Sequence, residues 1–258
     1  MRIAAGIEYN GLPYCGWQWQ DHSPSVQQEV EQALSIVADH EVKVVCAGRT
    51  DTGVHATGQV IHFDTEAERS DWSWLRGTNS NLPRSVGVLW VKPVPDEFHA
   101  RFSAIRRAYR YIINNRRERP VILDGQVTWQ FKPLDVLRMQ AAATFLLGQH
   151  DFSSYRAAGC QAKSPVREIY KLTLTRQADM IFLDIEANAF LQHMVRNIAG
   201  VLMTIGAGEA EIGWSKEVLE HQDRRLGGIT ASPAGLYLTQ VHYPERFRVP
   251  VNTKHVFS

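Results

Sequence analysis

The 258-residue sequence lacks the features of membrane, secreted and zinc-binding proteins. No segment approaches the roughly 18 consecutive apolar residues that a membrane span needs, so we expect no membrane association. The segment Met1–Tyr9 is too short and too charged for a signal peptide. The cysteines Cys15, Cys46 and Cys160 are scattered and form no C-x-x-C pair. Their number and spacing argue against a disulfide framework and against a metal site, and they suit a reducing cytoplasm.

The sequence also lacks a strong net charge, since its formal value is +1. No long-range attraction to nucleic acid follows from this sum, but the distribution is uneven. Between residues 101 and 119 only Glu118 opposes a set of arginines that we call the arginine strip: Arg101, Arg106, Arg107, Arg110, Arg116, Arg117 and Arg119. Such a strip suits a polyanion contact, although a solvated surface would have the same composition. The interleaved Tyr109 and Tyr111 favour RNA, because aromatic rings stack on bases.

The pattern of the first half predicts an α+β unit over residues 1–115. Alternating residues predict a strand at 2–9, and further strands are expected at 42–46, 58–63, 86–91 and 108–113. Ser25 and Gln28 resemble a capping box before a helix. The apolar stripe of that helix is Val26, Val30, Ala33, Leu34 and Val37. A short helix is expected near 71–79. Tyr14, Trp17 and Trp19 occupy an aromatic loop after the first strand.

The second half, residues 116–258, predicts another α+β unit whose strands could share a sheet with the first. A helix is expected near 134–147, with its stripe at Leu134, Leu137, Ala141 and Phe145. Strands at 168–176 and 180–187 form a predicted hairpin. A helix from about Phe190 to Ile205 is closed by Gly206, and a strand at 235–242 completes the core. The sequence shows no internal repeat and no low-complexity segment.

The most informative stretch is the loop around Asp51, which runs from Ala47 to Ala56 between two predicted strands. Asp followed by Thr-Gly is ordinary turn chemistry, so a structural role is the simplest interpretation. The tripeptide Asp51-Thr52-Gly53 also matches the aspartic-protease signature. However, Arg49 lies two residues upstream and would hold the carboxylate ionised, which disfavours a shared proton. A polar loop bracketed by glycines is also where a scaffold presents a reactive side chain.

Two further segments carry candidate site residues. Tyr109 shares a strand face with Arg107 and Tyr111, and Arg110 takes the other face. A tyrosine in a strand is most often a packed aromatic, but the neighbouring arginines weaken that interpretation. His193, Arg196, Asn197 and Gly200 share one face of the predicted helix at 190–205. Arg196 needs a carboxylate if it is buried, and Asp51 is a candidate, whereas a solvent-exposed polar fringe is the alternative.

Taken together, these motifs resemble the pseudouridine synthases of the TruA family. The resemblance begins with the segment Gly48–His55 and continues through Phe98–Ala104, Tyr109–Tyr111, Asn188–Phe190, His193–Ile198 and Gly235–Leu238. The motifs occur in the family's order and cover nearly the whole chain. Thr52 is a departure, since many relatives carry alanine there, but every expected catalytic group is retained.

The resemblance implies a role for each candidate residue. Asp51 is the implied nucleophile, Tyr109 lies against the target base, Arg196 pairs with Asp51, and Leu236 lines the pocket. Arg49 corresponds to a mobile arginine that fills the space of a flipped nucleotide, although a fixed structural role is the alternative. Arg107 and Arg110 are expected to contact substrate.

The resemblance also implies the reaction and the partners. Uridines at positions 38, 39 and 40 of the tRNA anticodon stem-loop would be isomerised to pseudouridine after base flipping. The isomerisation involves no redox change and no net water, so no cofactor and no metal are expected. Family members are homodimers in which two α+β halves share a central antiparallel sheet flanked by helices, and we expect the same here, in the cytoplasm. Because the RNA spans both protomers in the family, the arginine strip and the loop with Tyr14, Trp17 and Trp19 are expected to contact one tRNA from different chains. A non-catalytic RNA-binding module is the rival interpretation.

Overall fold

The computed structural model describes residues 1–251, which divide into two compact units. Unit 1 comprises Met1–Arg106 and the described residues from Tyr237 onward, and unit 2 comprises Arg107–Leu236. The sequence predicted a division after residue 115, with the last strand in the second half. Most of that strand belongs to unit 1, because it pairs in parallel with the strand that follows Asp51. Local sequence patterns cannot reveal a pairing between residues so far apart in the chain.

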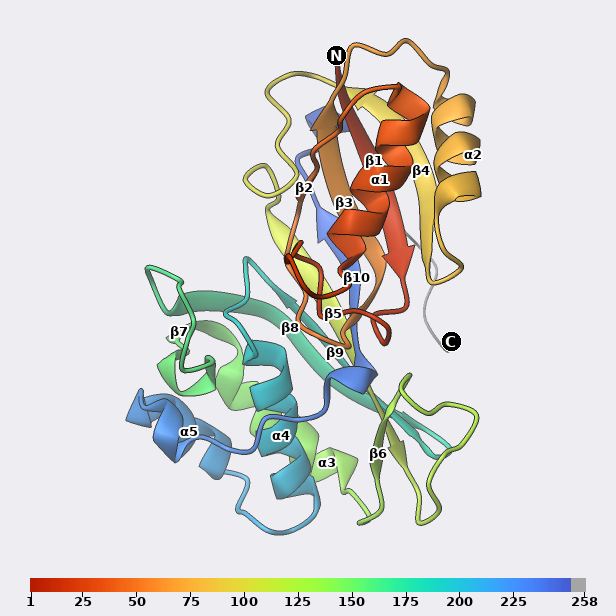
Figure 1. The fold of residues 1–258 in the computed structure, drawn as a ribbon. Coiled ribbons are helices and arrows are strands. Elements are labelled where there is room, and N and C mark those ends of the chain that lie inside the picture. The colour runs from red at the N-terminus through yellow and green to blue at the C-terminus, as the bar shows by residue number, and fades with distance from the viewer. Residues whose placement is uncertain (252–258) are drawn as a thin grey trace. The chain divides into compact units, whose positions relative to one another are not determined.

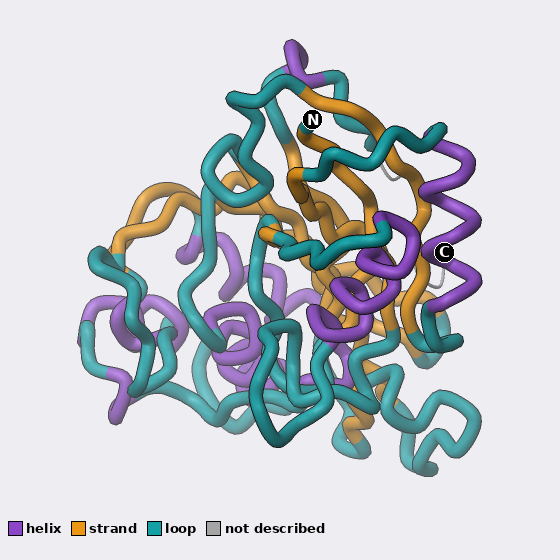
Figure 2. Tube along the Cα trace, turned by 45° about the horizontal axis from the view of Figure 1, so that its top comes forward, coloured by secondary structure: helices purple, strands orange, loops and turns teal. Residues whose placement is uncertain are grey.

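Unit 1 is a sheet with two helices. Its elements are β1 (Arg2–Tyr9), α1 (Val26–Ala38), β2 (Val45–Cys46), β3 (His55–Asp64), α2 (Asp71–Asn81), β4 (Val86–Val94) and most of β10 (Leu236–His242). The strand order is β4-β1-β3-β10, with β2 on β3, and only the β3–β10 pair is parallel. Both helices pack beside one another on the sheet, as Figures 1 and 2 show. The helices bury one face against the sheet. The loop before β3 lies at one end of the strands (Figure 1).

The first helix confirms the capping prediction. The Ser25 hydroxyl accepts a hydrogen bond from the Gln28 backbone N–H at 3.3 Å, which satisfies one of the donors at the helix start. Val26, Val30 and Leu34 are buried, as the stripe predicted. The strands on either side of Asp51 are also confirmed, although β2 is only two residues long and β3 begins at His55.

Unit 2 contains the remaining strands and its own helices. Its elements are β5 (Arg106–Asn115), β6 (Thr128–Gln130), α3 (Val136–Ala143), β7 (Gly148–Asp151), β8 (Val166–Gln177), β9 (Met180–Ala187), α4 (Met194–Gly206) and α5 (Trp214–His221). The strand order is β5-β9-β8-β7, with β6 parallel to β5 and the other pairs antiparallel. Helices α3, α4 and α5 pack on one another, and α3 contacts β8 (Figure 1). The α+β class with two α+β halves is confirmed.

The helix predicted near 134–147 differs from the structure. It starts later, because the Asp135 carboxylate caps it by accepting from the Leu137 and Arg138 backbone N–H groups. It gives way to a 3₁₀ turn at Thr144–Leu146. The predicted stripe was wrong, since Leu137 is 82% exposed and the helix buries Met139 instead. The buried face is instead Met139, Ala142 and Ala143, which are spaced three and four residues apart.

Two other predictions in unit 2 concern turns. The hairpin of β8 and β9 is confirmed, and Ala178 adopts the left-handed conformation, with φ of 49°, in its turn. Helix α4 begins four residues later than predicted, because His193 has φ of 63° and cannot continue a helix. The end of α4 at Gly206 is confirmed. No helix among residues 1–251 is long and apolar enough to cross a membrane.

Candidate active site

Asp51 lies in unit 1, in the turn that leads into β3. The Val54 N–H donates to the Asp51 carbonyl at 3.1 Å, and Gly53 takes a positive φ of 74°. The segment therefore forms a turn that is closed by the Asp51 carbonyl and uses the positive φ of Gly53. Asp51 is partly exposed, and Arg49 and Thr52 are exposed. A turn of this kind can therefore present the carboxylate at the surface of unit 1.

The segment between β1 and α1 holds the Asp51 turn by backbone contacts. The Trp17 N–H donates to the Thr50 carbonyl at 3.0 Å, and the Gly53 N–H donates to the Tyr14 carbonyl at 3.4 Å. Gly16 lies against the same backbone with φ of +98°, and a Cβ there would stand 2.8 Å from the Thr50 oxygen. Only glycine fits this approach without strain. The residues before and after Asp51 are therefore fixed by a segment some thirty-five positions earlier in the chain.

Side chains add three further restraints on this turn. The hydroxyls of Tyr9 and Thr50 are hydrogen-bonded at 2.8 Å, and both residues are buried. The buried His55 accepts the Gly11 N–H on its Nδ1 at 3.0 Å. Its ring stacks on Tyr237 of β10, with centroids 4.6 Å apart. A reactive side chain held by such a rigid frame needs little reorganisation to react.

Gln59 fixes the other side of the loop and was missed in the sequence. Its side-chain amide donates to the Gly48 carbonyl at 2.6 Å and accepts the Gly48 N–H at 3.4 Å. Gln59 is completely buried in β3. The signal that could have found it is a lone amide side chain inside an apolar strand, which must be paired when it is buried.

The aromatic loop at Tyr14–Trp19 has a different role from the one expected. Tyr14 and Trp17 are buried in unit 1 beneath the Asp51 turn, so they pack as a support and offer no face to RNA. Only Trp19 retains a large exposed fraction, 47%. The expectation failed because a loop without periodicity gives no indication of which aromatic rings point inward.

Cys46 is the other potential nucleophile near this loop. Burial raises the pKa of its thiol to about 12, and nearby Arg49 offsets this only in part. The reactive form of cysteine is the thiolate, which is scarce at neutral pH when the pKa is this high. Among the two groups, Asp51 is therefore the one suited to nucleophilic chemistry at pH 7.

Tyr109 and Arg107 lie on β5 in unit 2. The Tyr109 ring is 8% exposed and meets Phe190 edge to face, with centroids 5.0 Å apart. Arg107 donates to the Asn188 carbonyl at 3.0 Å. The structure therefore brings the Tyr109–Tyr111 and Asn188–Phe190 motifs together. This leaves Tyr109 as a positioned ring with most of its surface in contact with protein.

Arg110 points to the other face of β5, as the alternation predicted. Its guanidinium binds the Asp184 carboxylate of β9 in a two-pronged ion pair, with N···O distances of 2.7 and 3.0 Å. It also lies over the Phe182 ring at 5.0 Å. Arg110 is thus committed to a cross-strand pair, which weakens its assignment to substrate.

Arg196 occupies the first turn of α4. Its Nε donates to the Ala231 carbonyl at 2.8 Å, and the Ala231 N–H donates back to the Arg196 carbonyl at 3.2 Å. This reciprocal contact fixes the guanidinium relative to the segment that leads to β10. Leu236, the first residue of β10, is buried. The expected pairing of Arg196 with Asp51 stays a prediction.

Asn197, on the polar face of α4, is buried and hydrogen-bonded to neighbouring segments of unit 2. It is 1% exposed, and its amide donates to the Tyr155 carbonyl at 2.7 Å. Its oxygen accepts from the Thr230 hydroxyl at 2.6 Å and from Arg224 at 3.2 Å. The prediction that buried polar groups here must be paired is confirmed for Asn197. We call Asn197 a hub because its side chain connects α4 to Tyr155, Arg224 and Thr230, the last of which lies in the segment before β10.

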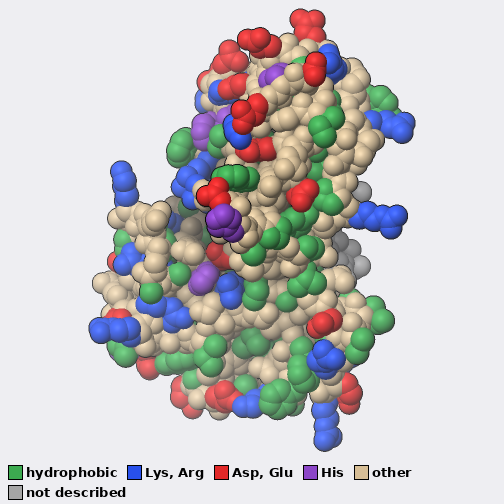
Figure 3. Space-filling model, in the orientation of Figure 1, with side chains coloured by type: hydrophobic (Ala, Val, Ile, Leu, Met, Phe, Trp, Pro, Cys, Tyr) green, Lys and Arg blue, Asp and Glu red, His purple; other side chains and the backbone are tan. Residues whose placement is uncertain are grey.

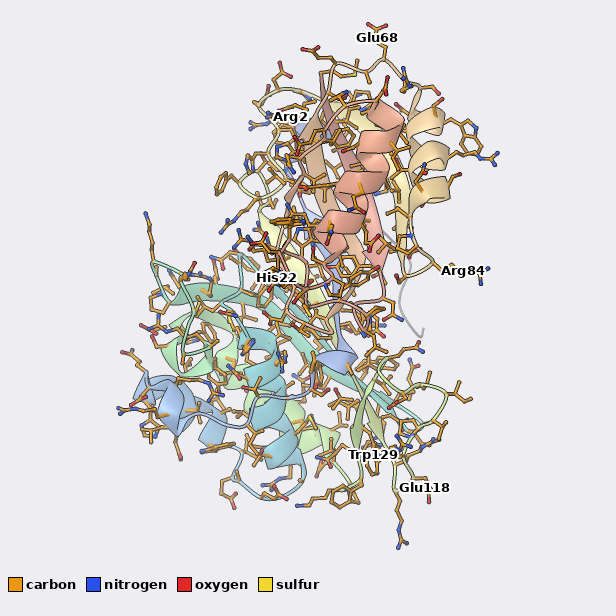
Figure 4. The ribbon with its side chains drawn as sticks, in the orientation of Figure 1. Arg2, His22, Glu68, Arg84, Glu118 and Trp129 are labelled. Atoms are coloured by element: carbon orange, nitrogen blue, oxygen red, sulfur yellow. The ribbon has the colours of Figure 1, made fainter. Side chains whose placement is uncertain are left out.

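The arginine strip is divided between the two units and spread along β5. Arg101 and Arg106 belong to unit 1, and the other five belong to unit 2. Arg107 and Arg116 are separated by nine positions, which is roughly 30 Å along a strand. Arg116 lies by Trp129, whose ring N–H donates to the Arg116 carbonyl at 2.9 Å. Figure 4 labels Trp129 and Glu118 at this end of unit 2. The strip is therefore not one continuous patch.

The predicted site residues are thus distributed over the two units. Asp51 and Arg49 belong to unit 1, whereas Arg107, Tyr109, Arg110, Arg196 and Leu236 belong to unit 2. Within residues 1–251, no group of three or more His, Cys, Asp or Glu side chains is arranged to hold a metal ion.

The sequence matches a known protein family. A family model described as tRNA pseudouridine synthase matches residues 5–103 and 142–244. The first matched segment contains the Asp51 turn and its supports, and the second contains α4 and β10. The match includes the Asp51 turn and α4 but not residues 104–141, which contain Arg107, Tyr109 and Arg110.

Similar proteins from bacteria carry a corresponding name. The tRNA pseudouridine synthase A of Pseudomonas aeruginosa strain PAO1 is 58% identical over 250 residues, which cover 96% of this chain and 88% of that protein. The protein of the same name from Coxiella burnetii strain Dugway 5J108-111 is 55% identical over 249 residues, covering 96% and 95%. A chain of the crystal structure of a Cbf5-Nop10-Gar1 complex is 12% identical, with a TM-score of 0.35, covering 78% of this chain and 45% of that one.

Proposed function

Because the chain belongs to the tRNA pseudouridine synthase family and is an isomerase, we propose that it isomerises uridines 38, 39 and 40 of the tRNA anticodon stem-loop. The observation that carries the proposal is the Asp51 turn, whose sequence Gly48–His55 resembles the family's catalytic motif. The segment is held on both sides by hydrogen bonds to Tyr9, Gly11 and Gln59. Membership of an isomerase family replaces the aspartic-protease interpretation.

The reaction defines what the site must supply. The N1–C1′ bond of uridine breaks, a C5–C1′ bond forms, C5 loses its proton and N1 gains one. Atoms and charge balance without a co-reactant, so the proposal includes no cofactor and no metal. The Asp51 carboxylate is the nucleophile, and it attacks either C1′ of the ribose or C6 of the uracil. The uridine leaves its stack to reach it, since the reacting atoms are buried in a helical stem.

Each remaining residue has a role in this proposal. Arg196 pairs with Asp51 and favours its charged form, because an adjacent cation stabilises a carboxylate. Tyr109 lies against the extruded uracil, Leu236 lines the pocket, and Arg49 fills the space that the base leaves. Arg107 binds the RNA backbone. Arg110 has the least support, because its guanidinium is already occupied by Asp184.

The proposal also covers the assembly and the compartment. The protein acts as a homodimer on one tRNA, in the cytoplasm. Cys15, Cys46 and Cys160 all stay unpaired in the structure, which fits a reducing compartment. The exposed arginines Arg117 and Arg119 suit phosphate contacts along the RNA.

Tritium release tests this function directly. An anticodon arm with [5-³H]uridine at one of positions 38, 39 or 40 loses its label when C5 forms the new bond. We expect release from each of the three arms, none from an arm labelled only at another position, and none with the Asp51→Ala variant. A rival RNA-binding module predicts binding without release by the wild type, which would overturn the proposal.

A further inference from the structure

The segment 98–105 of unit 1 forms a tightly built loop between β4 and β5 that the proposed chemistry does not use. Phe98 is fully buried and packs on Tyr243 and Phe247, with ring centroids 5.0 and 5.2 Å away. The Tyr243 hydroxyl donates to the Ala100 carbonyl at 2.6 Å. The Ile105 N–H donates to the His242 carbonyl at 2.9 Å. Both ends of the loop are therefore anchored in the core of unit 1.

Two histidines shape the tip of this loop. His62 of β3 accepts the Ala100 N–H on Nδ1 at 3.1 Å. His99 accepts the N–H groups of both Arg101 and Phe102 on its Nδ1, each at 3.2 Å. The Ser103 hydroxyl accepts the His99 N–H at 3.0 Å. With its backbone donors satisfied locally, the tip is a preorganised turn.

This rigid turn carries an exposed aromatic side chain. Phe102 is 77% exposed, and one side of its ring is stacked on His99, with centroids 4.3 Å apart and planes at 28°. The Arg101 guanidinium lies 5.6 Å from the centre of the Phe102 ring. Figure 3 shows histidine, hydrophobic and basic side chains gathered on one flank of unit 1. Exposing a large aromatic ring on an ordered support has no benefit for folding.

We propose that Phe102 and Arg101 form a stacking platform for an unpaired base of the RNA substrate, a contact separate from the reacting uridine. The inference rests on the proposed function, since it assumes a tRNA substrate. An aromatic ring next to a guanidinium is the combination that binds single-stranded nucleic acid: the ring stacks on the base and the cation contacts phosphate.

The charge around the ring supports RNA over a protein partner. Arg101 is adjacent to Phe102 on this loop, and the exposed Arg106 follows it as the first residue of β5. Arg2, labelled in Figure 4, adds a third guanidinium, which donates to the Phe98 carbonyl at 3.0 Å. Asp64 binds Arg2 through a two-pronged ion pair, and Arg101 is the cation that lies against the Phe102 ring. A guanidinium beside the ring can contact a phosphate next to a stacked base.

The experiment measures binding separately from isomerisation. The probe is an anticodon arm in which uridines 38, 39 and 40 are replaced by cytidine, so that affinity is measured without turnover. Phe102→Ala and Phe102→Leu are expected to weaken binding about 5- to 100-fold, as for loss of one base–aromatic stack. Phe102→Trp is expected to bind within about 3-fold of the wild type, because it keeps an aromatic face. Phe131→Ala, which removes an exposed phenylalanine of unit 2, is the matched control and should bind like the wild type.

Salt dependence separates the two parts of the platform. Arg101→Ala should lower the slope of log affinity against log salt by about 0.7 to 0.9, the value for one phosphate contact. The Phe102 variants should leave that slope unchanged. Since Phe102 is largely exposed, its variants should melt like the wild type.

Three results would overturn the proposal. The first is unchanged affinity of Phe102→Ala, and the second is a Phe102→Leu variant that binds as well as the wild type. The third is dissociation of a dimer into monomers by Phe102→Ala in sedimentation, which would assign the ring to a protein interface. Tritium release by the wild type decides the proposed function independently, so failure of the platform leaves that result intact.

Discussion

The Asp51 turn in unit 1 and the start of α4 in unit 2 are both fixed in place, but by different means. In unit 1 the turn is held mainly by backbone contacts, since Gly16 and Trp17 lie directly against residues 50–52. In unit 2 one buried side chain, that of Asn197, makes three hydrogen bonds to separate segments. Unit 1 is therefore sensitive to added volume, whereas unit 2 is sensitive to lost hydrogen bonds as well.

The difference suits the roles that we propose. A nucleophile benefits from a backbone frame that cannot shift, because a small displacement of a reacting atom lowers the rate steeply. Arg196 acts through charge, which tolerates more movement than a forming bond does. Its guanidinium is aligned by the Ala231 carbonyl, and Asn197 holds the chain nearby.

The largest expected effect comes from adding one methyl group to the frame of unit 1. A Cβ on Gly11 would stand 1.9 Å from the Val54 carbonyl oxygen, a backbone atom that cannot move without displacing the Asp51 turn. We expect Gly11→Ala to lower the free energy of unfolding by about 3 kcal/mol, at the upper end for overpacking. Denaturant unfolding measures it, with tritium release as the second readout.

Two other glycines make this test specific. Gly159→Ala is the control, because nothing lies within 4 Å of its Cβ position. Gly200→Ala in α4 would place a Cβ 1.8 Å from the Ile229 carbonyl oxygen, next to the Thr230 and Ala231 contacts, so a comparable loss is expected in unit 2. The comparison would fail if Gly11→Ala were as stable as Gly159→Ala.

The next effect tests the side-chain hub of unit 2. Asn197→Ala would leave the Tyr155 carbonyl, the Thr230 hydroxyl and part of the Arg224 guanidinium without their partner. A cost of about 2 kcal/mol in unfolding free energy is expected, since unsatisfied buried groups cost 1–3 kcal/mol. Thermal or urea unfolding measures this change.

Asn197→Asp keeps the acceptor for Thr230 and Arg224 but places an oxygen against the Tyr155 carbonyl. If the contacts to Thr230 and Arg224 contribute most of the stability, Asn197→Asp should be more stable than Asn197→Ala. Equal stability of Asn197→Ala and the wild type would contradict the assignment of Asn197 as a hub.

The smallest expected effect is a loss of stability of unit 1 at acid pH. Burial lowers the pKa of His62 from 6.5 to about 4, with a further contribution from nearby His99. Between these values the unfolded chain binds a proton on His62 and the folded chain does not. The His62 contribution to stability is therefore present above about pH 6.5 and is lost as the pH falls to about 4.

Comparison with His62→Asn isolates this contribution, because asparagine can accept the Ala100 N–H and does not titrate in this range. We expect the wild type to lose on the order of 1 kcal/mol more than the variant between pH 7 and pH 4.5, after allowance for solvent screening. Parallel stability curves for the two proteins would show that His62 does not titrate in this way.

The sequence predicted elements well where the signal was local. The Ser25 cap, the turn at Ala178 and the strand at Arg2–Tyr9 depend on neighbouring residues, and all three are confirmed. The candidate residues themselves came from the motifs around Asp51 and Arg196. Those motifs carry information because their chemistry restricts which residues can stand there.

What the sequence could not predict depends on distant contacts. The parallel pairing of β10 with β3 joins residues about 180 positions apart, so the unit boundaries were not predictable from local patterns. Tyr14 and Trp17 were taken as surface aromatics, but the turn that they support is remote in sequence. Gln59 went unnoticed because its partner Gly48 is recognised only once the loop is folded.

The central claim is that Asp51 performs chemistry and is not merely a turn residue. The most direct measurement compares Asp51→Asn with the wild type in anticodon-arm affinity and in single-turnover pseudouridine formation, with Asp124→Asn as an exposed control. We expect Asp51→Asn to bind within about 3-fold of the wild type while its rate falls by roughly 10⁴-fold or more, as when a nucleophile is removed. A variant that forms pseudouridine within about 10-fold of the wild-type rate would contradict the claim.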